Sequence, residues 1–265
     1  MIVTREQGAE ACTQLSLIAA KLIYQLNGMP PQQSQVNHFY KGVVVRTGIH
    51  LKDAAHILCS NHDEHISSAF SIFRIVLDDL LRACYVYSCS DRKRALDDIT
   101  AKAFSDYFKT WKEAARLNRT LNLGGDMTDV VVNEEREKFI ASAAGSRYTT
   151  TNKKGELVLR EVINSRVLVR AIEENPRVAH YSRGYVLFKQ MSHYIHYSML
   201  TYQMDRSESR QKEIGFIDEV IFLVYHLLRV SHEVLAETHA DLEWPSGPAD
   251  TSLDRVSYIV PVPVK

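Results

Sequence analysis

The stretch ISSAFSIFRIVLDDLLRAC, residues 66–84, decides the fold class of this chain. Its apolar residues recur every three or four positions, and at about 100° per residue they fall on one side of a helix. The members of this stripe are Ile66, Phe70, Phe73, Leu77, Leu80, Leu81 and Cys84. The pattern predicts a long amphipathic helix whose apolar side faces a core.

The same spacing recurs along most of the chain, and the strict alternation typical of strands is scarce. We therefore predict an all-α fold, a single multi-helix bundle that forms one domain over residues 1–243. The expected helices run over residues 5–27, 34–59, 62–88, 91–121, 133–145, 176–204 and 209–238. We place 62–88, 176–204 and 209–238 at the centre, because they carry the widest apolar stripes.

Several boundaries follow from local signals. Pro176 after Asn175 predicts a helix start. Gly42 and Gly48 leave open whether residues 34–59 form one helix or two. Residues 146–160 fit a small β-hairpin, since Asn152 to Gly155 is good turn chemistry, and residues 156–174 are either a helix or the end of that hairpin followed by a helix.

Residues 244–265 change in composition and predict an extended, Pro-containing C-terminal tail. Pro261 and Pro263 exclude a central strand there, because proline cannot donate to a ladder. Whether this tail docks on the bundle or stays loose is left open.

Composition narrows the class of protein. The chain has 32 basic and 32 acidic residues, so it lacks the strong cationic field expected of a nonspecific nucleic-acid or membrane-surface binder. Its four cysteines form no C-x-x-C pair, which indicates reduced thiols in a cytoplasmic protein. The longest apolar run, residues 216–230, is interrupted by charges and is shorter than the roughly 20 residues that a membrane span needs.

Common catalytic fingerprints are absent, among them G-x-S-x-G, G-x-x-x-x-G-K-[ST], G-x-G-x-x-G and H-E-x-x-H. Histidine pairs such as His62 with His65 fit one helix face, but no Glu-x-x-His occurs, as a helical di-metal centre would require. We therefore expect neither a metal site nor a cofactor.

The most distinctive string is MSHYIHYS, residues 191–198. On a helical wheel His193 points away from the apolar stripe, whereas His196 lies at its boundary beside Ser192. A boundary imidazole can be oriented by a neighbour and still reached by a ligand, as general acid–base catalysis requires. The alternative is a histidine that is hydrogen-bonded between helices.

Arg74 holds a similar edge position on the helix of residues 62–88, with Asp78 one turn later. An Arg that a carboxylate holds in place is a planar clamp for phosphate. The alternative is an ordinary exposed ion pair of little energetic value.

A basic segment follows in residues 147–170. Its candidate nucleic-acid contacts are Arg147, Lys153, Lys154 and Arg160. They fit the backbone of a nucleic acid, or else a solvated basic face.

Two segments carry a resemblance to a known family. Residues 68–79, with Arg74 and Asp78, resemble the R-x-x-x-[ED] helix of the bacterial family catalogued as domain of unknown function five-six-seven-seven, although Asp78 stands where Glu is more usual. Residues 192–198 resemble that family's S-x-x-[VI]-H-x-S segment. The resemblance implies a helical bundle similar to the HEPN (higher eukaryotes and prokaryotes nucleotide-binding) group, several of whose members are RNases in toxin or antiphage systems.

The RNase signature of that group, an Arg and a His on one helix with four to six residues between them, is missing here, since Arg46 and His50 have only three residues between them and Arg183 is too far from His196. Arg74 and His196 would therefore have to meet from different helices. The resulting hypothesis is a HEPN-like bacterial defence or stress protein that binds RNA or a nucleotide and cleaves phosphodiester bonds without metal. His196 would be the acid or base, and Arg74 with Asp78 and Ser192 would complete the site.

The alternative is a noncatalytic helical interaction module, a homodimer, in which the same residues pin helices together. Whether the chain is an enzyme stays open at this point. For partners we expect RNA or a nucleotide and a homo-oligomer, and no membrane.

Overall fold

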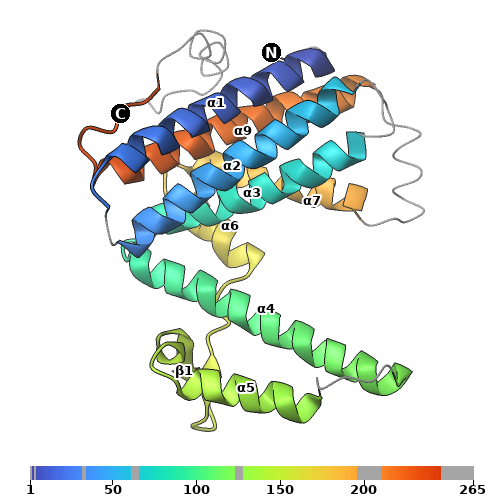
Figure 1. Cartoon of the computed structure of the whole chain (residues 1–265), viewed down its shortest axis with the longest axis vertical. Coiled ribbons are helices and arrows are strands. Elements are labelled where there is room, and N and C mark those ends of the chain that lie inside the picture. The colour runs from blue at the N-terminus through green and yellow to red at the C-terminus, as the bar shows by residue number, and fades with distance from the viewer. Residues whose placement is uncertain are drawn as a thin grey trace. The chain divides into compact units, whose positions relative to one another are not determined.

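The computed structural model describes Ile2 and residues 4–31, 34–60, 66–122, 128–195 and 210–245 (Figure 1). These residues contain eight α-helices and one two-stranded sheet, which confirms the predicted all-α bundle with a small hairpin. Residues 246–265, and with them most of the predicted tail, lie outside the described residues.

The chain divides into two compact units, one of residues 1–88 with 171–265 and one of residues 89–170. We call them the first and the second unit. The single domain expected over residues 1–243 stays a prediction, because compactness alone does not show which part folds independently.

The first unit begins with a helical hairpin. The helix α1 (Arg5–Gly28) starts where the Thr4 side chain accepts a hydrogen bond from the Gln7 N–H. The next helix, α2 (Gln35–Cys59), is continuous through both of its glycines. Gly8 lies beside Leu58 and Gly48 beside Ala19, so the two helices run antiparallel.

The centre of the first unit is α3 (Ile66–Ser88), which packs against α2, α7 (Arg183–Ile195) and α9 (Arg210–Ala236). Figure 1 shows α1, α2 and α9 side by side above α3. The stripe predicted from the sequence is buried at its six described members: Phe70, Phe73, Leu77, Leu80, Leu81 and Cys84. Apolar periodicity therefore identified the central helix.

The helix expected from Pro176 begins later than predicted. The Asn175 side chain accepts a hydrogen bond from the Arg177 N–H at 3.1 Å, and the Val178 N–H bonds to the Asn175 carbonyl at 3.0 Å. These bonds close a turn, because an Asn side chain competes with helical hydrogen bonding. A short 3-10 helix, η3 (Ala179–Ser182), then leads into α7.

The second unit is formed by α4 (Arg92–Leu121), α5 (Asp129–Ala141), η2 (Gly145–Tyr148) and the hairpin of β1 (Thr149–Thr151) with β2 (Leu157–Leu159). Thr149 pairs with Leu159 and Thr151 with Leu157, antiparallel. The start of α5 at residue 133 was a wrong prediction. The helix begins four residues earlier, at Asp129, because the Thr128 side chain caps the Val131 N–H.

The hairpin is followed by the helix α6 (Ser165–Glu173). Of the two interpretations of residues 156–174, the hairpin with a following helix is therefore the one observed. A small hydrophobic cluster joins α4, α5 and β2 in the second unit: Phe108, Ile140 and Leu159 are buried, and the partly buried rings of Phe104, Phe139 and Tyr148 pack against them.

Candidate functional site

Arg74 is held by two contacts from α7. Its Nε donates a hydrogen bond to Oγ of Ser192 at 2.9 Å, and its guanidinium carbon lies 4.6 Å from the centre of the Phe188 ring. The Ser192 hydroxyl in turn donates to the Phe188 carbonyl at 2.7 Å, which fixes the direction of its proton. Two residues singled out from sequence, 118 positions apart, are thus in direct contact.

Asp78 does not pair with Arg74. Its carboxylate forms an ion pair with Arg82 at 2.9 Å, one turn later on α3. The expected Arg74–Asp78 pair therefore needs correction: Asp78 has a basic residue on either side, and Arg74 is engaged by α7 instead. Among the residues that the structure describes, no carboxylate pairs with Arg74, so the charge of this half-buried guanidinium is left uncompensated there.

His196 lies outside the described residues, and the side chain of His193 is not described either. The acid–base role of His196 consequently stays a prediction. What the structure adds is the position of Ser192, four residues before His196 in the sequence, against Arg74.

In the second unit, the four basic residues proposed for nucleic acid differ in their surroundings. Arg160 is 4% exposed and forms an ion pair with Asp98 at 2.9 Å, which gives it a structural role that sequence alone did not indicate. Arg147 is paired with Asp97 at 2.8 Å. Lys153 and Lys154 are exposed at the hairpin turn, which Gly155 closes with a φ of 81°.

A hollow of about 490 Å³ in the first unit was missed by the sequence analysis. Glu233 forms its polar side, where it pairs with Arg177 and accepts a hydrogen bond from the Tyr87 hydroxyl at 3.0 Å. Arg229 also lines it and lies 4.7 Å from the Trp244 ring centre. No sequence motif indicates this hollow, because its residues come from α3, the turn before η3, η3 itself and α9.

His226 also lines that hollow and lies in an aromatic cluster. Its ring centre is 4.4 Å from that of Phe222 and 5.1 Å from that of Tyr181, and its Nε2 is buried without a hydrogen-bond partner among the described residues. Burial lowers the pKa of His226 to about 4, and His180 and Arg229 act in the same direction. A neutral imidazole of such low pKa is a weak base at neutral pH, which argues against an acid–base role. The sequence offered one indication that His226 is buried: this residue interrupts the apolar run 216–230.

Two further classes of site are absent from the described residues. No group of three or more His, Cys, Asp or Glu side chains there is arranged to hold a metal ion. None of the described helices has the length and apolar character needed to cross a bilayer.

Comparisons of this chain with protein-family models, curated proteins and solved structures find no match. The resemblance to the domain five-six-seven-seven family and to the HEPN group therefore stays a prediction from the two segments named above.

Proposed function

We propose that this protein binds phosphate groups of RNA or of a nucleotide through Arg74. The observation that carries the proposal is the guanidinium itself: Ser192 and Phe188 orient it, and no carboxylate of the described residues neutralises it. Nε donates to Ser192, so the two terminal nitrogens of the guanidinium remain in the geometry that can donate two parallel hydrogen bonds to one phosphate. An exposed, already paired arginine such as Arg82 lacks that property.

The catalytic part of the proposal rests on His196. In a HEPN-like defence or stress protein, this imidazole would take a proton from a ribose hydroxyl or give one to the leaving oxygen. Arg74 would stabilise the negative charge that develops on the phosphate. The supporting observation is that Ser192, four residues before His196 in the sequence, contacts Arg74.

A second function fits the same contact. The Arg74–Ser192 bond joins α3 to α7, and a helical interaction module, a homodimer, would need that bond only to hold its helices in place. The two functions predict different results when Arg74 is replaced and the chain still folds. Phosphate binding would weaken RNA or nucleotide affinity, whereas a purely structural contact would leave that affinity unchanged.

The test uses the full chain in EDTA with a short single-stranded RNA and, separately, a nucleoside diphosphate. Arg74→Ala should weaken binding about tenfold or more, the usual cost of losing a charge-assisted hydrogen bond. Arg82→Ala, on the same helix, is the matched control and should change affinity less than about twofold.

His196→Ala should keep RNA binding and lose cleavage. If Arg74→Ala binds both ligands as the unaltered chain does, while its melting temperature falls, the contact is structural and the scaffold function replaces the proposed one. Absence of any RNA or nucleotide binding by the unaltered chain leads to the same conclusion.

A further inference from the structure

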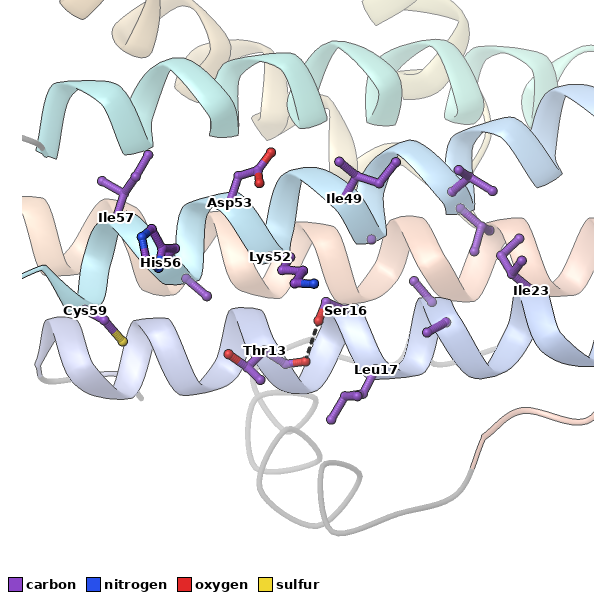
Figure 2. Close-up of a pocket in the computed structure, with 16 residues that line it drawn as sticks. Thr13, Ser16, Leu17, Ile23, Ile49, Lys52, Asp53, His56, Ile57 and Cys59 are labelled. Carbon is purple, nitrogen blue, oxygen red and sulfur yellow. Dashed lines mark hydrogen bonds between the residues drawn. The ribbon is translucent and has the colours of Figure 1, made fainter.

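A long groove runs between α1 and α2 on the outside of the first unit. Its volume is about 1050 Å³, and Figure 2 shows its residues spread along both helices from Cys59 and His56 at one end to Ile23 at the other. The two helices approach closely at Gly48, where an added Cβ would lie 3.0 Å from that of Ala19.

Large apolar side chains of this groove face the solvent. Leu17 is 51% exposed, Ile49 55% and Val45 38%. Contiguous apolar surface of this kind usually marks a binding surface, since covering it removes apolar area from water. We therefore expect the groove to bind another segment or molecule, and the course of the chain indicates which one.

The last described residues bring the chain to the rim of the groove. Gln25 of α1 donates to the Glu243 carbonyl at 3.2 Å and accepts from the Glu243 N–H at 3.0 Å. Trp244 and Pro245 then line a smaller hollow, of about 530 Å³, together with Leu17 and Ala20. Those two residues also line the groove, so the chain leaves the described part beside its own apolar surface.

The sequence that follows is suited to such a surface. Residues 256–264, VSYIVPVPV, are mostly β-branched or aromatic, and Pro261 and Pro263 favour an extended backbone that needs no partner strand. The eleven residues from Pro245 to Val256 span up to about 36 Å when extended. The stretch of α1 from Gln25 to Thr13 is only about 18 Å long, so the segment reaches the whole groove.

We propose that residues 256–264 occupy the α1–α2 groove of their own chain. Because the segment and the groove belong to one chain, the effective concentration of the segment at the groove is about 1 mM. Even a weak interaction, with a dissociation constant of about 0.1 mM, would then be roughly 90% formed. Asp254 and Arg255, which precede the segment, carry one charge of each sign, as do Lys52 and Asp53 of the groove.

The experiment measures how fast a maleimide labels a single cysteine in the groove. Ile49→Cys is placed in the full chain with Cys59→Ser and Cys89→Ser. The two remaining native thiols are buried, and burial raises the pKa of Cys12 to about 12 and that of Cys84 further, so neither competes. The matched control is Val186→Cys on α7, where the native side chain is 54% exposed.

Ile259→Asp combined with Val260→Asp should undock the segment and raise the labelling rate of Ile49→Cys about tenfold, with no change at Val186→Cys. Equal rates at Ile49→Cys with and without the two aspartates would overturn the proposal. A rate that falls with protein concentration and ignores the aspartates would overturn it too, in favour of a second copy. Circular dichroism checks that each variant is folded.

Discussion

The two units of this protein are stabilised by different kinds of interaction. The first buries long rows of aliphatic side chains on α1, α2, α3 and α9. The second has a hydrophobic cluster of three buried residues, supported by ring contacts, such as Phe104 with Phe139 at 4.4 Å, and by the Asp98–Arg160 pair. A unit with little apolar area to bury depends more heavily on each single contact.

The comparison can be measured because each unit contains one of the two tryptophans. Trp111 lies on α4 and Trp244 follows α9. Trp244→Phe leaves fluorescence that reports on the second unit, and Trp111→Phe leaves fluorescence that reports on the first. Urea unfolding followed with each single-tryptophan chain therefore gives the stability of each unit in turn.

Gly145→Ala should have the largest effect, confined to the second unit. A Cβ at this position would lie 1.8 Å from the Phe139 carbonyl oxygen, a backbone atom that cannot move aside without breaking the end of α5. We expect a loss of more than about 4 kcal/mol, enough to unfold this unit. The Trp111 transition should disappear while the Trp244 transition persists. If both transitions shift together, the chain is one cooperative domain as the sequence predicted.

Asp98→Ala should rank second. It strips the counter-charge from Arg160, which is 4% exposed, and breaking a buried pair costs about 3–5 kcal/mol. Asp97→Ala next to it removes the more exposed pair with Arg147 and should cost about 1 kcal/mol or less. Adding Arg160→Met to Asp98→Ala should recover most of the loss. Failure of that rescue would mean that Asp98 acts through something other than the ion pair.

The sequence predicted the first unit better than the second, for a physical reason. Apolar periodicity reports burial against a long core, so the stripe from Phe70 to Cys84 could be identified without coordinates. Arg160 directly follows the short strand β2, and a single basic residue carries no periodic signal. It was therefore assigned to a nucleic-acid surface.

The candidate site was predictable in part for a similar reason. Wheel geometry placed Arg74 and Ser192 each at the edge of an apolar stripe, and edges of packed helices meet. The partner of Asp78 was not predictable, because residues at i−4 and i+4 are equally near on a helix. The hollow beside His226 could not be predicted at all, since it combines residues about 90 to 150 positions apart.

The third prediction concerns pH and the first unit. The folded pKa of His226, about 4, lies below its ordinary 6.5, so the unfolded chain binds the extra proton as pH falls from 6.5 towards 4. His226 should therefore cost the fold about 2 kcal/mol at pH 5 relative to pH 7.5. His226→Gln cannot be protonated and should remove that loss.

Asp79 has the opposite effect on the stability of the fold over the same range of pH. Burial raises its pKa from 3.8 to about 6, so its folded carboxyl gains a proton first and favours the fold as pH drops. The stability of the unaltered chain can therefore look flat between pH 7.5 and 5. Subtracting it from that of His226→Gln at each pH cancels the Asp79 contribution. A difference that does not change with pH would show that His226 is not desolvated in solution.

The smallest effect is expected from a second glycine-to-alanine change, this time in the first unit. Gly42 lies exposed inside α2, and a Cβ added there has no heavy atom within 4 Å. Gly42→Ala should stabilise the first unit by about 0.5–1 kcal/mol, because alanine loses less backbone entropy than glycine when a helix forms. The Trp244 transition should move to higher urea with an unchanged slope, and the Trp111 transition should stay in place. A destabilised first unit would mean that α2 bends at Gly42 in solution, and the interpretation of residues 34–59 as two helices would then regain support.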